Sequence, residues 1–155
     1  RPHARRLPQT CSPIRQPMSK TGTTQEETTY RVRVFYEDTD ASGVVYHANY
    51  LKYLERARTC WLEAHGHSHT ALAEQFGIVF TLADANLQFK APARLDDEIE
   101  VVTRVAERRR ARIIFEQTIH CKNSLLIQAR FTVACVRIHD FRPCAVPEFL
   151  QKEMQ

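Results

Sequence analysis

An acidic loop followed directly by a helix start is the part of this sequence best suited to chemistry. Residues 36–50 read YEDTDASGVVYHANY, with Asp40 three residues before Gly43 and seven before His47. Unpaired backbone N–H groups at a helix N-terminus carry partial positive charge, so they can bind a carbonyl oxygen as it becomes an oxyanion. A carboxylate upstream can attack the same carbonyl or activate a water against it. The pattern predicts acyl transfer, with Asp40 as base or nucleophile and Gly43 permitting close approach of a substrate.

Other polar groups are weaker candidates for chemistry. Asp38 is interpreted as structural, and the spacing of the acids in residues 37–40 matches no calcium loop. The three histidines in residues 65–69 lack a neighbouring cysteine or carboxylate to complete a tetrahedral metal set. We therefore predict no metal site. Glu55 is an alternative catalytic acid, although it can also pair with Arg58 along the same helix.

Hydrophobic periodicity indicates the elements that must position this loop. Apolar residues recur every three or four positions over residues 47–65, which predicts a long helix whose charged face includes Arg58 and which Gly66 ends. Alternating apolar residues predict strands over 30–36, 78–89, 97–107, 111–121 and 125–138. Shorter helical segments are expected over 70–76 and 147–152. We expect one strand, the long helix, and then four antiparallel strands joined by hairpins.

The long helix must bury its apolar side, and one antiparallel sheet of five strands offers a face for it. The sequence thus predicts an α+β fold in which a five-stranded antiparallel sheet wraps around one long helix. The other face of the sheet and its edges then need cover. We therefore expect the chain to form homo-oligomers.

Length and composition suit a single domain over residues 29–155, preceded by a disordered basic leader or extension over residues 1–28. Residues 1–24 hold five of the 22 basic residues and no acid, so the remainder carries a net charge of −1. This distribution argues against nucleic-acid binding by the domain. No apolar run approaches the ~18 residues that cross a membrane. Five scattered cysteines without a C-x-x-C pair indicate a reducing compartment, and we predict a cytoplasmic protein.

Residues 38–50 resemble the D-x-D-x-x-G-hydrophobic-hydrophobic-x-H-x-x-Y signature of the 4-hydroxybenzoyl-CoA thioesterase family, most closely its YbgC-type branch. The resemblance continues through YLERAR at residues 53–58 and APARLDD at residues 91–97, and it covers about residues 30–147. It implies a hot-dog fold, homodimers or homotetramers with active sites between subunits, and hydrolysis of acyl-CoA thioesters without metal or other cofactor. Coenzyme A is then part of the substrate.

Carried over by position, Asp40 matches the catalytic carboxylate of the family, and His47 matches the histidine whose backbone N–H polarises the thioester carbonyl. The resemblance places substrate against Gly43 and the pair Val45 and Tyr46. The chain departs from the commonest pattern at Ser42, where a second glycine is usual, and at Asn49.

Basic residues are the candidates for holding the CoA phosphates, because guanidinium and ammonium groups bind phosphate oxygens. Lys90 and Arg94 flank a proline turn, and a run of arginines occupies residues 108–112. We interpret the arginine run as a solvated hairpin. Lys90 and Arg94 are kept as substrate-binding candidates.

Two rival functions stay open beside hydrolysis of an acyl-CoA. One is a non-catalytic partner that binds acyl-CoA or acyl-carrier protein in a cell-envelope complex. The other is a hot-dog dehydratase, which usually places its histidine and carboxylate differently. The sequence leaves several points undecided, namely the acyl chain, dimer against tetramer, and nucleophile against general base for Asp40.

Overall fold

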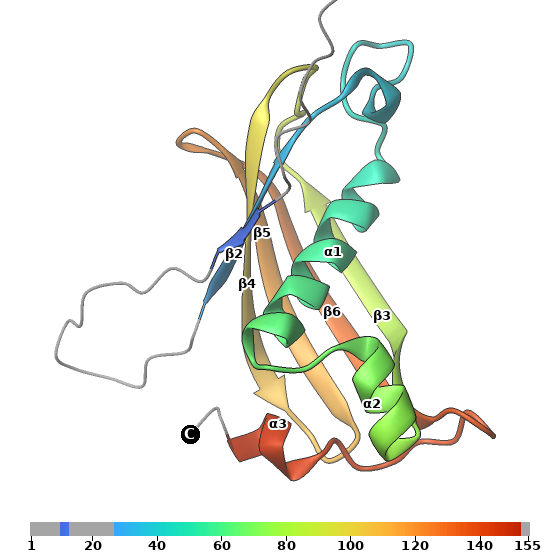
Figure 1. Cartoon of the computed structure of the whole chain (residues 1–155). Coiled ribbons are helices and arrows are strands. Elements are labelled where there is room, and N and C mark those ends of the chain that lie inside the picture. Colours follow the sequence, from blue (N-terminus) through green and yellow to red (C-terminus); the bar gives the residue numbers. More distant parts are fainter. Residues whose placement is uncertain (1–9, 13–26, 153–155) are drawn as a thin grey trace, which may run out of the picture.

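The computed structural model describes residues 10–12 and 27–152. Within them a six-stranded antiparallel sheet has the strand order β1-β2-β4-β5-β6-β3, and a long helix lies along one face of it (Figure 1). The strands are β1 (Thr10–Ser12), β2 (Thr28–Arg33), β3 (Ile78–Phe89), β4 (Glu98–Arg108), β5 (Arg112–Cys121) and β6 (Ser124–Arg137). The helices are α1 (Asn49–Ala64), α2 (His69–Phe76) and α3 (Glu148–Lys152), with a short 3-10 helix η1 (Tyr36–Asp38).

Strands β2 to β6 confirm the predicted five-stranded antiparallel sheet, and β1 adds a short sixth strand that the sequence did not predict. β1 pairs with β2 and lies inside the predicted leader over residues 1–28. A segment of three residues is too short for an alternation of apolar and polar residues to indicate a strand. The prediction that the leader is disordered otherwise falls on residues outside the described part of the chain.

The predicted order of hairpins is wrong at its first step. β4, β5 and β6 follow one another as antiparallel neighbours, but β3 pairs with β6, from Ile78 opposite Arg137 to Phe89 opposite Ile127. Eight residues separate β3 from β4, which exceeds the two to five residues of ordinary hairpin loops. They cross the end of the sheet, and β3 therefore becomes an edge strand.

Helix α1 forms because its apolar residues share one side, and that side packs on the sheet. Tyr53, Leu54, Ala57 and Trp61 are buried in one cluster with inward-facing strand residues such as Phe131. The helix starts two residues later than predicted and ends one residue earlier. Gly66 follows with a left-handed φ of 82°, which confirms the predicted stop.

A buried glutamine ties α1 to the sheet by polar contacts. Gln117 on β5 is 1% exposed, and its Nε2 donates to the carbonyl of Leu54 at 3.0 Å and to Thr103 Oγ1 at 2.9 Å. Its Oε1 accepts from Arg58 Nη1 at 3.0 Å. Arg58 is therefore partly buried beneath α1, and its predicted place on the charged, solvated face is wrong. The methylene groups of the Arg58 side chain pack beside the apolar side of α1, and the guanidinium group therefore points toward the sheet.

The cysteines are not uniform in state. Cys121, Cys135 and Cys144 carry free thiols. Cys60, buried in the core, is disulfide-bonded, which the sequence analysis did not predict. Among the described residues, no helix has the length and apolar character needed to cross a bilayer.

Candidate active site

The loop that carries Asp40 is a tight turn between η1 and α1. The Asp40 N–H donates to the carbonyl of Val44, and the Gly43 N–H donates to the carbonyl of Asp40, both at 3.0 Å. Gly43 closes the turn with a φ of 80°, a left-handed conformation that glycine adopts without steric cost. Thr39 and Val45 form a β-bridge at the base of the turn. Asp40 is thus held at an exposed tip.

Asp38 braces the loop from within. One carboxylate oxygen accepts from the backbone N–H of Phe35 at 2.8 Å, and the other accepts from Asn49 Nδ2 at 3.0 Å. The Asp38 carbonyl also accepts from the N–H of Tyr46 at 2.9 Å. Both side-chain oxygens are used inside the protein. These contacts agree with a structural role and fix the first residue of α1 relative to the end of β2.

The segment between β3 and β4 supports the loop from the other side. The Val45 N–H donates to the carbonyl of Ala93 at 2.9 Å, and Val44 forms a β-bridge with Arg94. The Ala93 N–H in turn donates to the buried Tyr50 hydroxyl at 3.0 Å. Residues almost fifty positions apart in sequence therefore meet at the start of α1.

Ser42 sets the electrostatics of the Asp40 carboxylate. The Ser42 backbone N–H donates to Asp40 Oδ1 at 2.8 Å, and the Ser42 hydroxyl donates to the same oxygen. Both hydrogen bonds lower the pKa of Asp40 below its ordinary value, and the bond from the Ser42 hydroxyl has the larger effect. Positive charge on His47 lowers the pKa further. Asp40 is therefore an exposed, ionised carboxylate at neutral pH, as a base or nucleophile requires.

His47 lies in the turn just before α1, and not inside the helix as predicted. Its ring is exposed and contacts the Tyr46 ring, with 4.5 Å between centroids. In the described part of the chain, the His47 backbone N–H donates to no acceptor. Such a free N–H in front of a helix is the donor that an oxyanion needs.

The remaining predicted site residues divide between the loop and its surroundings. Tyr46 is 48% exposed beside His47, whereas the Val45 side chain is buried in the core. Arg94 is exposed and adjoins the loop through its bridge to Val44, and Lys90 is exposed directly after β3. The turn between β4 and β5, which holds the arginine run, lies at the opposite end of the sheet (Figure 1).

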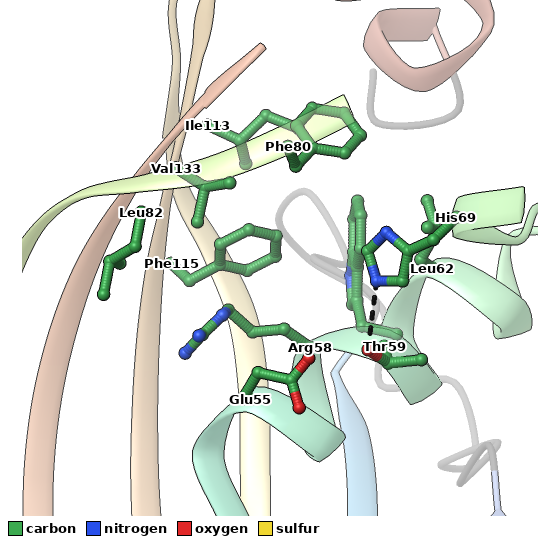
Figure 2. A pocket seen from close by; sticks show the side chains of 11 residues that line it. Glu55, Arg58, Thr59, Leu62, His69, Phe80, Leu82, Ile113, Phe115 and Val133 are labelled. Atoms are coloured by element: carbon green, nitrogen blue, oxygen red, sulfur yellow. Dashed lines mark hydrogen bonds between the residues drawn. The ribbon is translucent and has the colours of Figure 1, made fainter. Parts of the chain in front are cut away.

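A separate pocket lies between α1 and the sheet, farther along the helix (Figure 2). Its volume is about 160 Å³. Apolar side chains form most of its wall, among them Trp61, Phe80, Ile113, Phe115 and Val133. Polar groups enter from Glu55, Arg58, Thr59 and His69. Of the candidates from the sequence, the alternative acid Glu55 lines this pocket, whereas Asp40, His47 and the predicted substrate-binding residues do not.

Sequence reasoning missed this pocket for identifiable reasons. Trp61 is a core residue, and the apolar periodicity of α1 does not show that its ring also borders a cavity. His69, which the sequence presents only as a weak candidate for a metal ligand, lines the pocket with its Nε2 3.0 Å from Thr59 Oγ1. Among the described residues, no group of three or more His, Cys, Asp or Glu side chains is arranged to hold a metal ion.

Comparison with known proteins decides the family. The sequence profile of the thioesterase-like superfamily matches residues 34–154. An Escherichia coli relative named acyl-CoA thioester hydrolase YbgC is 41% identical over 125 residues, which cover 80% of this chain and 92% of the relative. Its Haemophilus influenzae counterpart, acyl-CoA thioesterase YbgC, is 40% identical over 119 residues, 77% of this chain and 88% of the relative. The chain belongs to the thioesterase-like superfamily.

Solved structures agree with this membership in the thioesterase-like superfamily. The crystal structure of a 1,4-dihydroxy-2-naphthoyl-CoA thioesterase from Synechocystis superposes with a TM-score of 0.76 at 25% identity, covering 83% of this chain and 95% of that one. The hot-dog fold and the YbgC-type resemblance predicted from the sequence are both confirmed.

Proposed function

We propose that this chain is an acyl-CoA thioesterase that hydrolyses an acyl-CoA to the free acid and CoA. The observation that carries the proposal is the Asp40 carboxylate, ionised and fixed by Ser42 at the turn that precedes α1. The names of the YbgC relatives support the same activity.

Two routes use the same atoms. As a general base, Asp40 takes a proton from a water whose oxygen attacks the thioester carbonyl, and the C–S bond then breaks to release CoA thiolate, which is protonated. As a nucleophile, Asp40 forms an acyl anhydride and expels CoA, and water hydrolyses the anhydride. In both routes the His47 N–H stabilises the oxygen that becomes negative.

Substrate contacts follow from the surroundings of the loop. Gly43 leaves open space above the turn, because nothing lies within 4 Å of where a Cβ would stand. Tyr46 provides an exposed ring for the pantetheine or acyl group. We assign the CoA phosphates to Arg94, which adjoins the loop through its bridge to Val44, and to Lys90 directly after β3. Hydrolysis of this kind needs no metal or cofactor.

The proposal includes a homodimer or homotetramer. β3 is an edge of the sheet over twelve residues, and its middle is exposed, with Leu82 at 49%. Long edge strands of this kind pair with other chains unless they are covered. Replacing Leu82 by Lys should shift the chain toward monomer in light scattering, whereas Lys at Leu125, exposed at the start of β6, should not. An unchanged assembly in both variants would contradict pairing through β3.

We place the protein in the cytoplasm, where CoA thioesters are made. Three of its described cysteines carry free thiols, as a reducing compartment favours, whereas the disulfide at Cys60 does not fit that compartment. An acyl-carrier protein is a second possible carrier of the acyl group. Comparing acyl-CoA with the same acyl group on a carrier protein tests this directly.

The decisive experiment measures thiol release from short, long and aromatic acyl-CoAs with the native chain and Asp40→Asn. Asparagine keeps the shape and removes the base, so kcat should fall about a hundredfold or more. Asp96→Asn is the control, because Asp96 is an exposed acid whose one side-chain partner among the described residues is Arg33, at 3.0 Å. If the native chain releases no thiol, the binding-partner function replaces hydrolysis; turnover of enoyl-CoA by hydration would indicate a dehydratase.

A further inference from the structure

The pocket between α1 and the sheet contains a cation that the proposed reaction does not use. Figure 2 shows Arg58 extending from α1 across the pocket, beneath the Phe115 ring. Its guanidinium carbon lies 4.2 Å from the centre of the Phe131 ring. Burial lowers the pKa of Arg58 to about 10, so the group stays charged at neutral pH. A positive charge is thus held against apolar walls.

The contacts of Arg58 leave most of its hydrogen-bonding capacity open. In the part of the chain that the structure describes, its one hydrogen bond goes to Gln117 Oε1, a neutral amide oxygen, at 3.0 Å. Glu55 lies one helical turn earlier and counteracts the pKa shift, but the two side chains form no ion pair. A guanidinium has five N–H donors. Donors beside an apolar pocket favour an occupant that brings an acceptor oxygen.

The shape and lining of the pocket define that occupant further. A volume of about 160 Å³ is below the roughly 300 Å³ at which pockets for drug-sized ligands begin. It suits an acyl group and not a whole coenzyme. Phe80, Phe115 and Val133 form an apolar wall, so the body of the occupant is hydrocarbon.

We propose that this pocket receives the acyl group of the substrate, and that Arg58 selects acyl groups with an acceptor oxygen at the end remote from the thioester. A carboxylate is the strongest such partner because it can accept two N–H bonds of the guanidinium. The inference rests on the proposed thioesterase function and specifies its substrate class. Arg58 lies nine residues along α1 from Asn49, roughly 14 Å at the helical rise of 1.5 Å per residue. An extended acyl chain of medium length can span that distance.

The test compares kcat/KM for acyl-CoAs of several lengths that end in methyl, hydroxyl or carboxylate. The native chain should favour an oxygen-ended chain over its methyl-ended counterpart of equal length. Arg58→Met keeps the apolar stem and removes the donors, so it should lower kcat/KM for oxygen-ended chains about tenfold to a hundredfold. Methyl-ended chains should change by less than about threefold.

Lys52→Met is the matched control, because it removes an exposed cation of α1 that does not line the pocket. Arg58→Lys keeps the charge and provides a folded variant if Arg58→Met is unstable. The melting temperature of each variant is also measured. A variant that loses activity at a native melting temperature has lost a substrate contact, whereas a lowered melting temperature indicates that the contact between Arg58 and Gln117 stabilises the fold. An equal loss for methyl-ended and oxygen-ended chains, or native preference for methyl ends, would overturn the proposal.

Binding of the free acids, measured by calorimetry, makes the same comparison without turnover. An Arg58-dependent preference for the oxygen-ended acid supports this inference even if no thioester is hydrolysed. Conversely, turnover can depend on Asp40 and show no preference for the group at the chain end. That result supports the proposed hydrolase function and overturns this inference. The two proposals therefore fail separately.

Discussion

Ser42 donates both its backbone N–H and its hydroxyl to the same oxygen, Oδ1, of the Asp40 carboxylate. Among the described residues, the second oxygen of Asp40 accepts no hydrogen bond, so it stays available to a water or a thioester. Ser42 occupies a position where the YbgC-type pattern usually has glycine. A glycine keeps the N–H and lacks the hydroxyl, so this chain holds its carboxylate by one more hydrogen bond.

Replacing Ser42 by Gly should move the acid side of the pH–rate profile to higher pH. Hydrogen bonds from Ser42 lower the pKa of Asp40, which keeps the carboxylate ionised as pH falls. Without the hydroxyl, the pKa rises, and kcat/KM declines sooner on acidification. Ser42→Thr retains the hydroxyl and should keep the native profile. An identical profile for Ser42→Gly would show that Asp40 does not govern this limb.

Replacing Gly43 by Ala should cost about 1 kcal/mol of stability, because alanine is strained at a φ of 80°. Gly77 offers a matched control, since it also has a left-handed φ, 63°, and equally open surroundings. Both variants should lose about 2–4 °C in melting temperature. Only Gly43→Ala should also lower kcat, because it distorts the turn that carries Asp40. Equal activity of the two variants would argue against that turn as the site.

Tyr50→Phe should destabilise the protein by about 1–3 kcal/mol in urea unfolding, because it leaves the Ala93 N–H without its acceptor in a buried position. Tyr36 is 83% exposed, and Tyr36→Phe should have no effect on stability. Thiol release should fall for Tyr50→Phe alone, since Ala93 also holds Val45. If Tyr50→Phe unfolds at the same urea concentration as the native chain, the hydrogen bond from Ala93 to the Tyr50 hydroxyl contributes nothing to stability.

Gln117→Met should cost about 2–4 kcal/mol, since it deletes three hydrogen bonds and leaves Arg58 buried without its partner. Adding Arg58→Met should recover part of that loss, because the stranded charge is then removed. Denaturant unfolding of the two single variants and the double variant gives the coupling energy. Strictly additive losses would mean that the two side chains act independently.

The sequence predicted most elements well, because local periodicity reports which face of an element is buried. The prediction for residues 78–89 matches β3 at both ends, and the helix over residues 47–65 matches α1 within two residues. Periodicity does not report which strands are neighbours, so the pairing of β3 with β6 was missed. That pairing depends on contacts between segments about forty residues or more apart.

The same limit applies to the site. The order of Asp40, Gly43 and His47 along the chain marked the loop, because they lie within eight residues. Arg58 looked like an ordinary helix-surface cation, and its burial depends on Gln117, 59 residues away. A pocket assembled from five elements, α1, α2, β3, β5 and β6, leaves no signature in any one of them. The roles of Asp40 and His47 in turnover stay predictions until the variants are assayed.

The backbone bonds around the Asp40 turn bear on how the site works in time. Surface loops commonly rearrange over nanoseconds to microseconds, but here the Val45 and Tyr46 amides donate to two different neighbouring segments. Opening the loop requires both bonds to break, so their amide protons should exchange slowly with solvent. The carboxylate is then already oriented when substrate arrives. If Asp40 is the catalytic group, the entropic cost of orienting its carboxylate is met during folding, and turnover does not have to order this loop again.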